Sequence, residues 1–122
     1  MNIKILSQGF TVCKLEDFTM VDYTDTFCFT AKTDEEYSLV CSTAHTPPNT
    51  IEREDGWRAM RIDGVLDFSL VGILAGISSL LAEHEVSIFA ISTYNTDYIL
   101  VKASQLEAAV NALTENGYTL AK

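Results

Sequence analysis

The residues of this sequence that are best suited to hold a small charged molecule lie in two short segments, 64–72 and 93–97. The second segment supplies hydroxyls, a phenol ring, an amide and one carboxylate from Thr93, Tyr94, Asn95, Thr96 and Asp97. In the first segment, Ser69 adds a hydroxyl, Gly72 leaves room, and the free N–H groups of a helix start attract an anion. The two segments therefore have the chemistry to hold a zwitterion, with its anion at the helix and its cation at Asp97.

The same residues also suit ordinary structural roles. Ser69 is a good N-cap for the helix that follows it. Asn95 or Asp97 is typical of an Asx turn in a hairpin loop. Residue types alone leave both interpretations open.

Other chemistries lack the residue patterns that they need. The sequence contains no G-x-S-x-G elbow, glycine-rich phosphate loop, Rossmann fingerprint or H-E-x-x-H motif. Neither His45 nor His84 has a cysteine at metal-ligand spacing. Cys13, Cys28 and Cys41 form no C-x-x-C pair and stand in apolar runs, which favours buried reduced thiols. We therefore expect no metal, no cofactor and no catalysis.

The composition is that of an acidic globular protein. Hydrophobic residues make up 48%, and 17 acidic against 8 basic residues give a net charge of -9. A field of that sign repels phosphate backbones and anionic lipid, so we expect neither nucleic acid nor membrane partners, although solubility alone also explains the acidity. The least polar run, 70–82, is shorter than the roughly 20 residues that span a bilayer. The first residues lack the apolar run and cleavage site of a signal peptide, so we expect none and expect a cytoplasmic protein.

The two segments must be positioned by the elements around them, and the second half of the chain has the clearer pattern. Alternation, helical spacing and turn residues predict strands at 57–63, 86–93, 98–103 and 118–121 and helices at 69–84 and 105–115. The order βαββαβ predicts an α+β, ferredoxin-like fold, an antiparallel sheet with both helices on one face. In that fold the first βα loop and the hairpin loop become neighbours.

The first half predicts a shortened version of the same unit. Strands are expected at 10–15, 26–32 and 37–43, with a helical turn within 16–25 and a linker at 45–54. The chain is therefore divided into a βαββ module at 1–55 and a complete module at 56–122. Units of about 60 residues are marginal alone, so we expect the halves to pack together and the chain to dimerise.

Residues 81–101, LAEHEVSIFAISTYNTDYILV, resemble the signature of small bacterial ACT-domain proteins. That signature is a helix ending L-A-E, then V-S-I/V-F/L-x-x-S-T-Y/F-x-T-D, then I-L-V. The runs 27–30 and 36–40 match the hairpin of the family's first module. These proteins are related to the ACT modules of cytosolic arginine sensors and, more distantly, of aspartate kinases. The resemblance covers roughly residues 9–120.

The resemblance implies a regulatory protein that binds a free amino acid between ACT modules or subunits. Carried over to this sequence, it points to Thr93, Tyr94 and Asp97 in the hairpin and to Ser69, Leu70, Val71 and Gly72 in the βα loop. The arginine sensors have four modules in one chain, so a matching interface here implies a homodimer. Two rival functions stay open: a ligand-free structural or interaction module, and a small enzyme on a ferredoxin-like scaffold.

Overall fold

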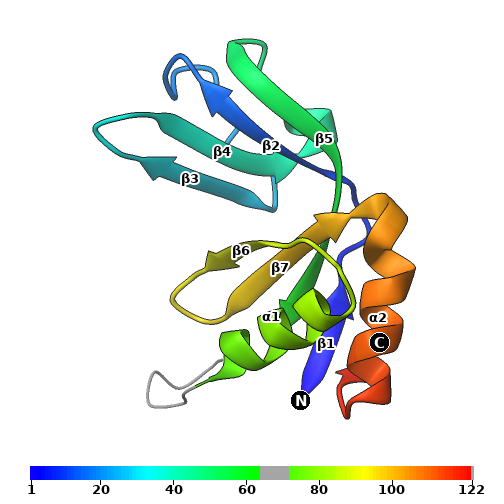
Figure 1. The fold of residues 1–122 in the computed structure, drawn as a ribbon. Coiled ribbons are helices and arrows are strands. Elements are labelled where there is room, and N and C mark those ends of the chain that lie inside the picture. The colour runs from blue at the N-terminus through cyan, green and yellow to red at the C-terminus, as the bar shows by residue number, and fades with distance from the viewer. Residues whose placement is uncertain (64–71, 122) are drawn as a thin grey trace. The chain divides into compact units, whose positions relative to one another are not determined.

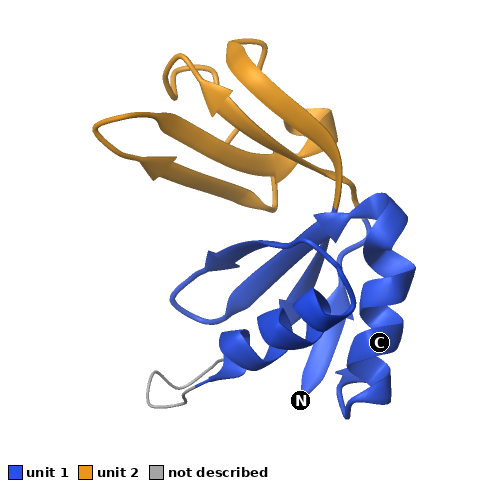
Figure 2. Ribbon diagram, in the orientation of Figure 1, with its two compact units in different colours: residues 1–7, 58–122 blue, residues 8–57 orange. Residues whose placement is uncertain are grey.

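The computed structural model describes residues 1–63 and 72–121 (Figure 1). They form two compact units (Figure 2): unit 2 comprises residues 8–57, and unit 1 comprises residues 1–7 together with the remainder of the chain from residue 58. The long strand β5 (Thr50–Ile62) begins in unit 2 and ends in unit 1. The predicted site residues Ser69, Leu70 and Val71 lie outside the described residues.

Unit 1 has the expected βαββαβ order, which confirms the α+β, ferredoxin-like prediction. After the end of β5 come α1 (Ile73–Glu83), β6 (Phe89–Ser92), β7 (Asp97–Lys102), a 3-10 turn (Ala103–Gln105), α2 (Leu106–Glu115) and β8 (Thr119–Leu120). Both helices contribute to one apolar core with the sheet, through Ile77 and Leu81 of α1 and Leu113 of α2. Their apolar residues recur every three or four positions, so each helix presents one stripe to the strands.

The strand β1 (Asn2–Ile5) is an addition to this order. Unit 1 has the strand order β8-β1-β5-β7-β6, so β1 lies between β5 and β8. It is antiparallel to β5, where Ile3 pairs with Ile62, and parallel to β8, where Ile3 pairs with Leu120. Residues 1–7 thus belong to unit 1, whereas the sequence pattern placed them with the first half. The assignment of 1–55 and 56–122 as two ACT-like modules stays a prediction.

Unit 2 is built from strands. They are β2 (Phe10–Leu15), β3 (Cys28–Lys32), β4 (Tyr37–Ser42) and the first part of β5, in the antiparallel order β3-β4-β2-β5, with a 3-10 turn at Thr43–His45. Turns occupy the region expected to hold a helical turn. The reason is that Asp17 and Asp22 accept hydrogen bonds from the backbone N–H groups two residues further on, and such Asx turns compete with a helix.

The expected linker at 45–54 is wrong in its second half. β5 already begins at Thr50, and Glu52 and Arg53 pair with residues of β2. The residues 51–56 are all exposed, so they lack the alternation of apolar and polar side chains that reveals a strand in sequence. Backbone pairing with β2 forms this part of the strand.

Both helices of unit 1 end in the same hydrogen-bonding motif. At α1, the N–H of Val86 donates to the carbonyl of Leu81 at 2.9 Å, and the N–H of Glu85 donates to Ala82 at 3.0 Å. At α2, Tyr118 likewise donates to Leu113 at 3.1 Å. This is the Schellman motif, in which the residue after the cap is left-handed. Gly117 holds that position after α2 with φ 95°, as the expected helix stop, but Glu85 holds it after α1 with φ 60°.

Replacing Glu85 with glycine is expected to raise the free energy of unfolding by about 0.5–1 kcal/mol, because a left-handed residue with a Cβ is strained. Urea unfolding of the two proteins measures the change. The matched control is Gly117→Ala, which creates the same strain after α2 and should destabilise by a similar amount. Equal stability of Glu85→Gly and the parent would contradict the assigned strain.

Candidate functional site

The β6–β7 hairpin closes over the four residues 93–96, with Ser92 paired to Asp97 at its base. The backbone N–H of Thr93 donates to the carbonyl of Thr96 at 2.9 Å, and the Thr93 hydroxyl donates to the same carbonyl at 2.9 Å. The N–H of Thr96 in turn donates to the Thr93 hydroxyl at 3.3 Å. The turn is thus built on Thr93, and not on Asn95 or Asp97 as an Asx turn would be.

Thr96 fastens this hairpin to the end of β5. Its side chain is 5% exposed, and its hydroxyl donates to the backbone carbonyl of Ile62 at 2.7 Å. Ile62 is the last residue of β5, two positions before the segment 64–71 begins. The hairpin loop therefore lies beside the point where the chain enters the predicted βα loop, at one end of the unit 1 sheet (Figure 1).

Asp97 offers a carboxylate at the base of the hairpin. It is half-buried, and the Ser92 hydroxyl donates to its Oδ1 at 2.6 Å. Within the described part of the chain, Asp97 forms no ion pair with a Lys, Arg or His side chain. A half-buried carboxylate with a fixed orientation and no described counter-ion suits an ammonium group.

The tip of the hairpin and the start of α1 complete the candidate site. Tyr94 has 80% of its surface exposed and Asn95 is also exposed. Gly72 is the residue before α1 and has φ 78°, a conformation that few other residues adopt. No described side chain caps α1, and the first N–H groups of a helix have no partner within it. The positive end of α1 is thus suited to a carboxylate.

The structure therefore gives the predicted hairpin residues two different tasks. Thr93 and Thr96 use their hydroxyls to build and fasten the loop, while Tyr94, Asn95 and Asp97 present their polar groups outside it. Sequence reasoning did not find the bond between Thr96 and Ile62. The bond from Ser92 to Asp97 could have been predicted from the sequence. The two residues flank the four-residue loop of a hairpin, and such residues are cross-strand partners.

A second polar cluster, in unit 2, fastens the turns of 16–27 to the sheet. Asp25 accepts from both the N–H and the hydroxyl of Ser42, each at 2.8 Å. The Thr24 hydroxyl and His45 at 2.7 Å lower the pKa of Asp22 to about 2, and the pKa of His45 is raised by the same carboxylate. These bonds are structural, and the described residues contain no group of three His, Cys, Asp or Glu side chains arranged to hold a metal ion.

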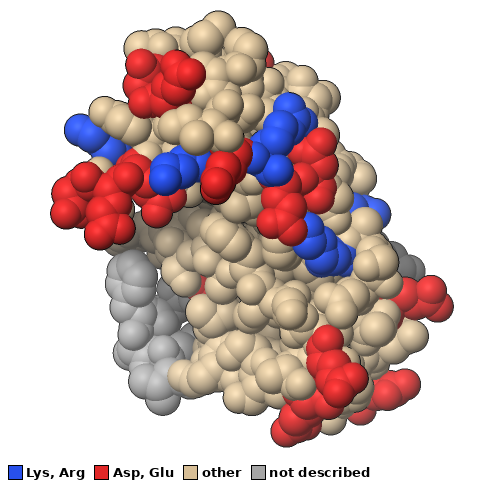
Figure 3. All heavy atoms as spheres, turned by 45° about the horizontal axis from the view of Figure 1, so that its top comes forward, with Lys and Arg blue, Asp and Glu red and all other residues tan. Residues whose placement is uncertain are grey.

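The surface charge agrees with the acidic composition. On the face shown in Figure 3, Lys and Arg side chains lie among Asp and Glu and form no separate basic patch. Within 1–63 and 72–121, no helix has the length and apolar character that crossing a bilayer takes.

Comparison with known proteins identifies the family. The sequence profile of the ACT domain matches residues 52–115, more than half of the chain. A protein from Agobacterium tumefaciens has a similar structure, with a TM-score of 0.85 and 26% identity over 98% of this chain and 91% of that one. The regulatory subunit of aspartate kinase from Thermus thermophilus, in its ligand-free form, has a TM-score of 0.67 and 10% identity, covering 96% and 98% of the two chains.

Aspartate kinase from Clostridium acetobutylicum, an allosteric enzyme, matches 93% of this chain with 33% of its own length, at a TM-score of 0.65 and 17% identity. No curated protein matches the chain. These distant matches share the fold, and the profile covers most of β5, both helices and the β6–β7 hairpin. The chain belongs to the ACT domain family.

Proposed function

We propose that this protein is a non-catalytic, cytoplasmic regulatory sensor that binds a free amino acid at the β6–β7 hairpin and the segment leading into α1. The observation that carries the proposal is the half-buried Asp97 carboxylate, oriented by Ser92 beside a loop that Thr96 fastens to the end of β5. A zwitterion fits this arrangement because its ammonium group can pair with Asp97 while its carboxylate approaches the N–H groups at the start of α1.

The ligand's side chain would meet the tip of the hairpin. Tyr94 and Asn95 are exposed there and offer a ring face and an amide. The carried-over residues Ser69, Leu70, Val71 and Gly72 contribute to binding the same ligand in this proposal. The family supports the same assignment, since ACT domains are regulatory modules.

A homodimer is the second part of the proposal. Within unit 1, β6 ends the strand order, and a strand in that position can pair with another chain. The run 86–96, which contains β6, has no charged residue. Charged side chains are the usual protection of a strand edge, so their absence favours pairing with a second copy. Ligand bound at the end of β6 would then bias the association of the two copies.

A thermal-shift screen of the twenty amino acids at millimolar concentration tests the proposal. A ligand present at 100 times its Kd stabilises the folded state by about 2.7 kcal/mol, so at least one amino acid should raise the melting temperature. Asp97→Asn should abolish most of that shift, because the neutral amide keeps the shape and the acceptor for Ser92 but loses the charge.

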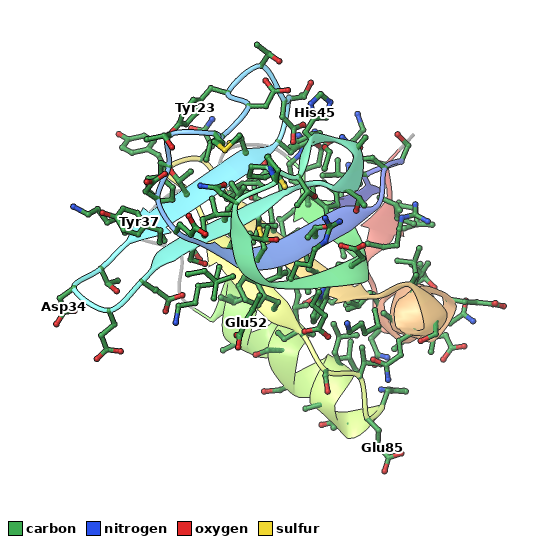
Figure 4. All side chains as sticks on the ribbon, turned by 90° about the horizontal axis from the view of Figure 1, so that it is seen from above. Tyr23, Asp34, Tyr37, His45, Glu52 and Glu85 are labelled. Atoms are coloured by element: carbon green, nitrogen blue, oxygen red, sulfur yellow. The ribbon has the colours of Figure 1, made fainter. Side chains whose placement is uncertain are left out.

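The control is Asp34→Asn, which removes one charge at the exposed tip of the β3–β4 hairpin (Figure 4) and should leave the shift unchanged. The ligand-free interaction module is the second candidate, favoured by the uncharged β6 edge. It predicts a dimer whose stability responds to no amino acid. Either an absence of any shift, or equal shifts in Asp97→Asn and the parent, would overturn amino-acid binding at this site.

A further inference from the structure

The three cysteines of the chain lie on one face of the unit 2 sheet. Cys28 on β3 is the direct partner of Cys41 on β4. Cys13 on β2 pairs with Leu39, two residues before Cys41, and is therefore its diagonal neighbour. Side chains two residues apart on a strand share a face, so all three thiols meet in the same small core.

The hydrogen-bond pattern of the β3–β4 hairpin brings Cys28 and Cys41 close together. At its loop, the N–H of Thr33 donates to the carbonyl of Glu36 at 3.0 Å, so Thr33 and Glu36 form a hydrogen-bonded pair. Hydrogen-bonded and non-hydrogen-bonded pairs alternate along antiparallel strands, so the pair of Cys28 and Cys41 is of the second kind. Such pairs have Cα atoms about 4.5 Å apart, inside the range of about 4.4–6.8 Å that a disulfide spans.

The two thiols differ in exposure and in acidity. Cys41 is 2% exposed, whereas Cys28 is only half-buried and can be reached from solvent. The pKa of Cys41 is lowered, first by its hydrogen bond with the Cys13 thiol and then by its contact with the Thr46 hydroxyl, whose oxygen is 3.7 Å from its sulfur. Burial raises the pKa of Cys28. An accessible thiol thus faces a sheltered thiol that ionises more readily.

We propose that Cys28 and Cys41 form an oxidation site, in which a peroxide converts the two facing thiols into a reversible disulfide across β3 and β4. The Cys28 sulfur first takes an oxygen from hydrogen peroxide, giving a sulfenic acid and one water. The Cys41 thiolate then attacks the Cys28 sulfur. The S–S bond forms, the S–O bond breaks, and the leaving hydroxide takes a proton and becomes the second water.

Peptide mapping of the peroxide-treated native protein tests this site directly. Lys14, Lys32 and Arg53 place the three cysteines on three different tryptic peptides, so each linkage has its own mass. The expected product has lost two hydrogen atoms and joins peptide 15–32 to peptide 33–53. A thiol reductant should restore the original mass. The melting temperature should be higher in the oxidised form, because the bond closes the 28–41 loop in the unfolded chain.

Two serine variants make the assignment specific. Cys28→Ser should lose the disulfide under the same treatment, although Cys13 and Cys41 remain in contact. Cys13→Ser should still form it, because that thiol only assists Cys41. A linkage through Cys13, a dimer joined through Cys28, or stable oxygen adducts without any loss of hydrogen would each overturn the proposal.

Discussion

Replacing Ile3 with alanine is expected to lower the free energy of unfolding of unit 1 by about 2–5 kcal/mol. Ile3 is 2% exposed and stands in the apolar core formed by the sheet and both helices. It belongs to β1, whose neighbours β5 and β8 lie far away in the sequence. Truncation leaves a cavity in this core, between the sheet and the helices, that the closely packed neighbours fill only in part.

Urea unfolding followed by circular dichroism measures this effect. The matched control is Lys4→Ala, which changes the next residue of β1 on the opposite, exposed face and should alter stability by less than about 0.5 kcal/mol. If the two variants were equally stable, β1 would not be part of the unit 1 core. The strand also carries backbone bonds on both sides, from the N–H of Asp63 to the carbonyl of Asn2 and from Ala121 to Ile3.

Thr96→Val is expected to have the second-largest effect, lowering stability by about 1–3 kcal/mol and weakening amino-acid binding as well. Valine keeps the shape of threonine but cannot donate to the carbonyl of Ile62, which then lies near a buried apolar methyl. The hairpin would lose its attachment to β5, and Asp97 would no longer be held beside a loop fixed to the end of that strand.

Chemical unfolding and titration with the amino acid identified by screening measure the two effects. Thr96→Ser is the matched control, because serine keeps the hydroxyl and loses only a methyl group. It should retain most of the affinity and lose stability only by the small cost of the missing methyl. Affinity that is unchanged in Thr96→Val would show that the Thr96–Ile62 bond does not position the site.

Much of unit 1 could be predicted because its signals are local. The spacing of Leu74, Ile77 and Leu81 marks one face of α1, and Gly117 ends α2 where the sequence pattern indicates. The residues between Ser92 and Asp97 indicate a hairpin by their turn propensity alone. In each case a few neighbouring residues determine the structure, so no distant partner has to be known.

The parts that were wrong depend on distant partners or on competing side chains. β1 shows only Ile3 and Ile5 as an apolar pattern, and its place is set by pairing with Ile62 and Leu120. The first residues of β5 have exposed charges on both faces, so only the backbone of β2 makes them a strand. The carboxylates of Asp17 and Asp22 accept backbone hydrogen bonds that form Asx turns in place of the expected helical turn. Helix propensity alone does not predict these hydrogen bonds.

The sequence indicates which polar groups the hairpin offers, but it does not indicate which of them hold the loop in place. By their type alone, Tyr94, Asn95 and Asp97 indicate a loop with the polar groups that a ligand site needs. Thr96 looks like one more ligand-binding hydroxyl in the sequence, yet its side chain is buried and bonded to Ile62. Only the folded arrangement separates Thr96, which holds the loop, from Tyr94, Asn95 and Asp97, whose polar groups lie outside it.

Nuclear magnetic resonance titration of the ¹⁵N-labelled protein with the stabilising amino acid tests amino-acid binding most directly. Saturable shifts of the backbone amides of Thr93, Asp97 and the first turn of α1 are predicted, with the amides of the β3–β4 hairpin unchanged. The same titration of Asp97→Asn should need a far higher ligand concentration to produce them. Saturable shifts confined to unit 2, or no shifts with any of the twenty amino acids, would contradict an amino-acid site at the β6–β7 hairpin.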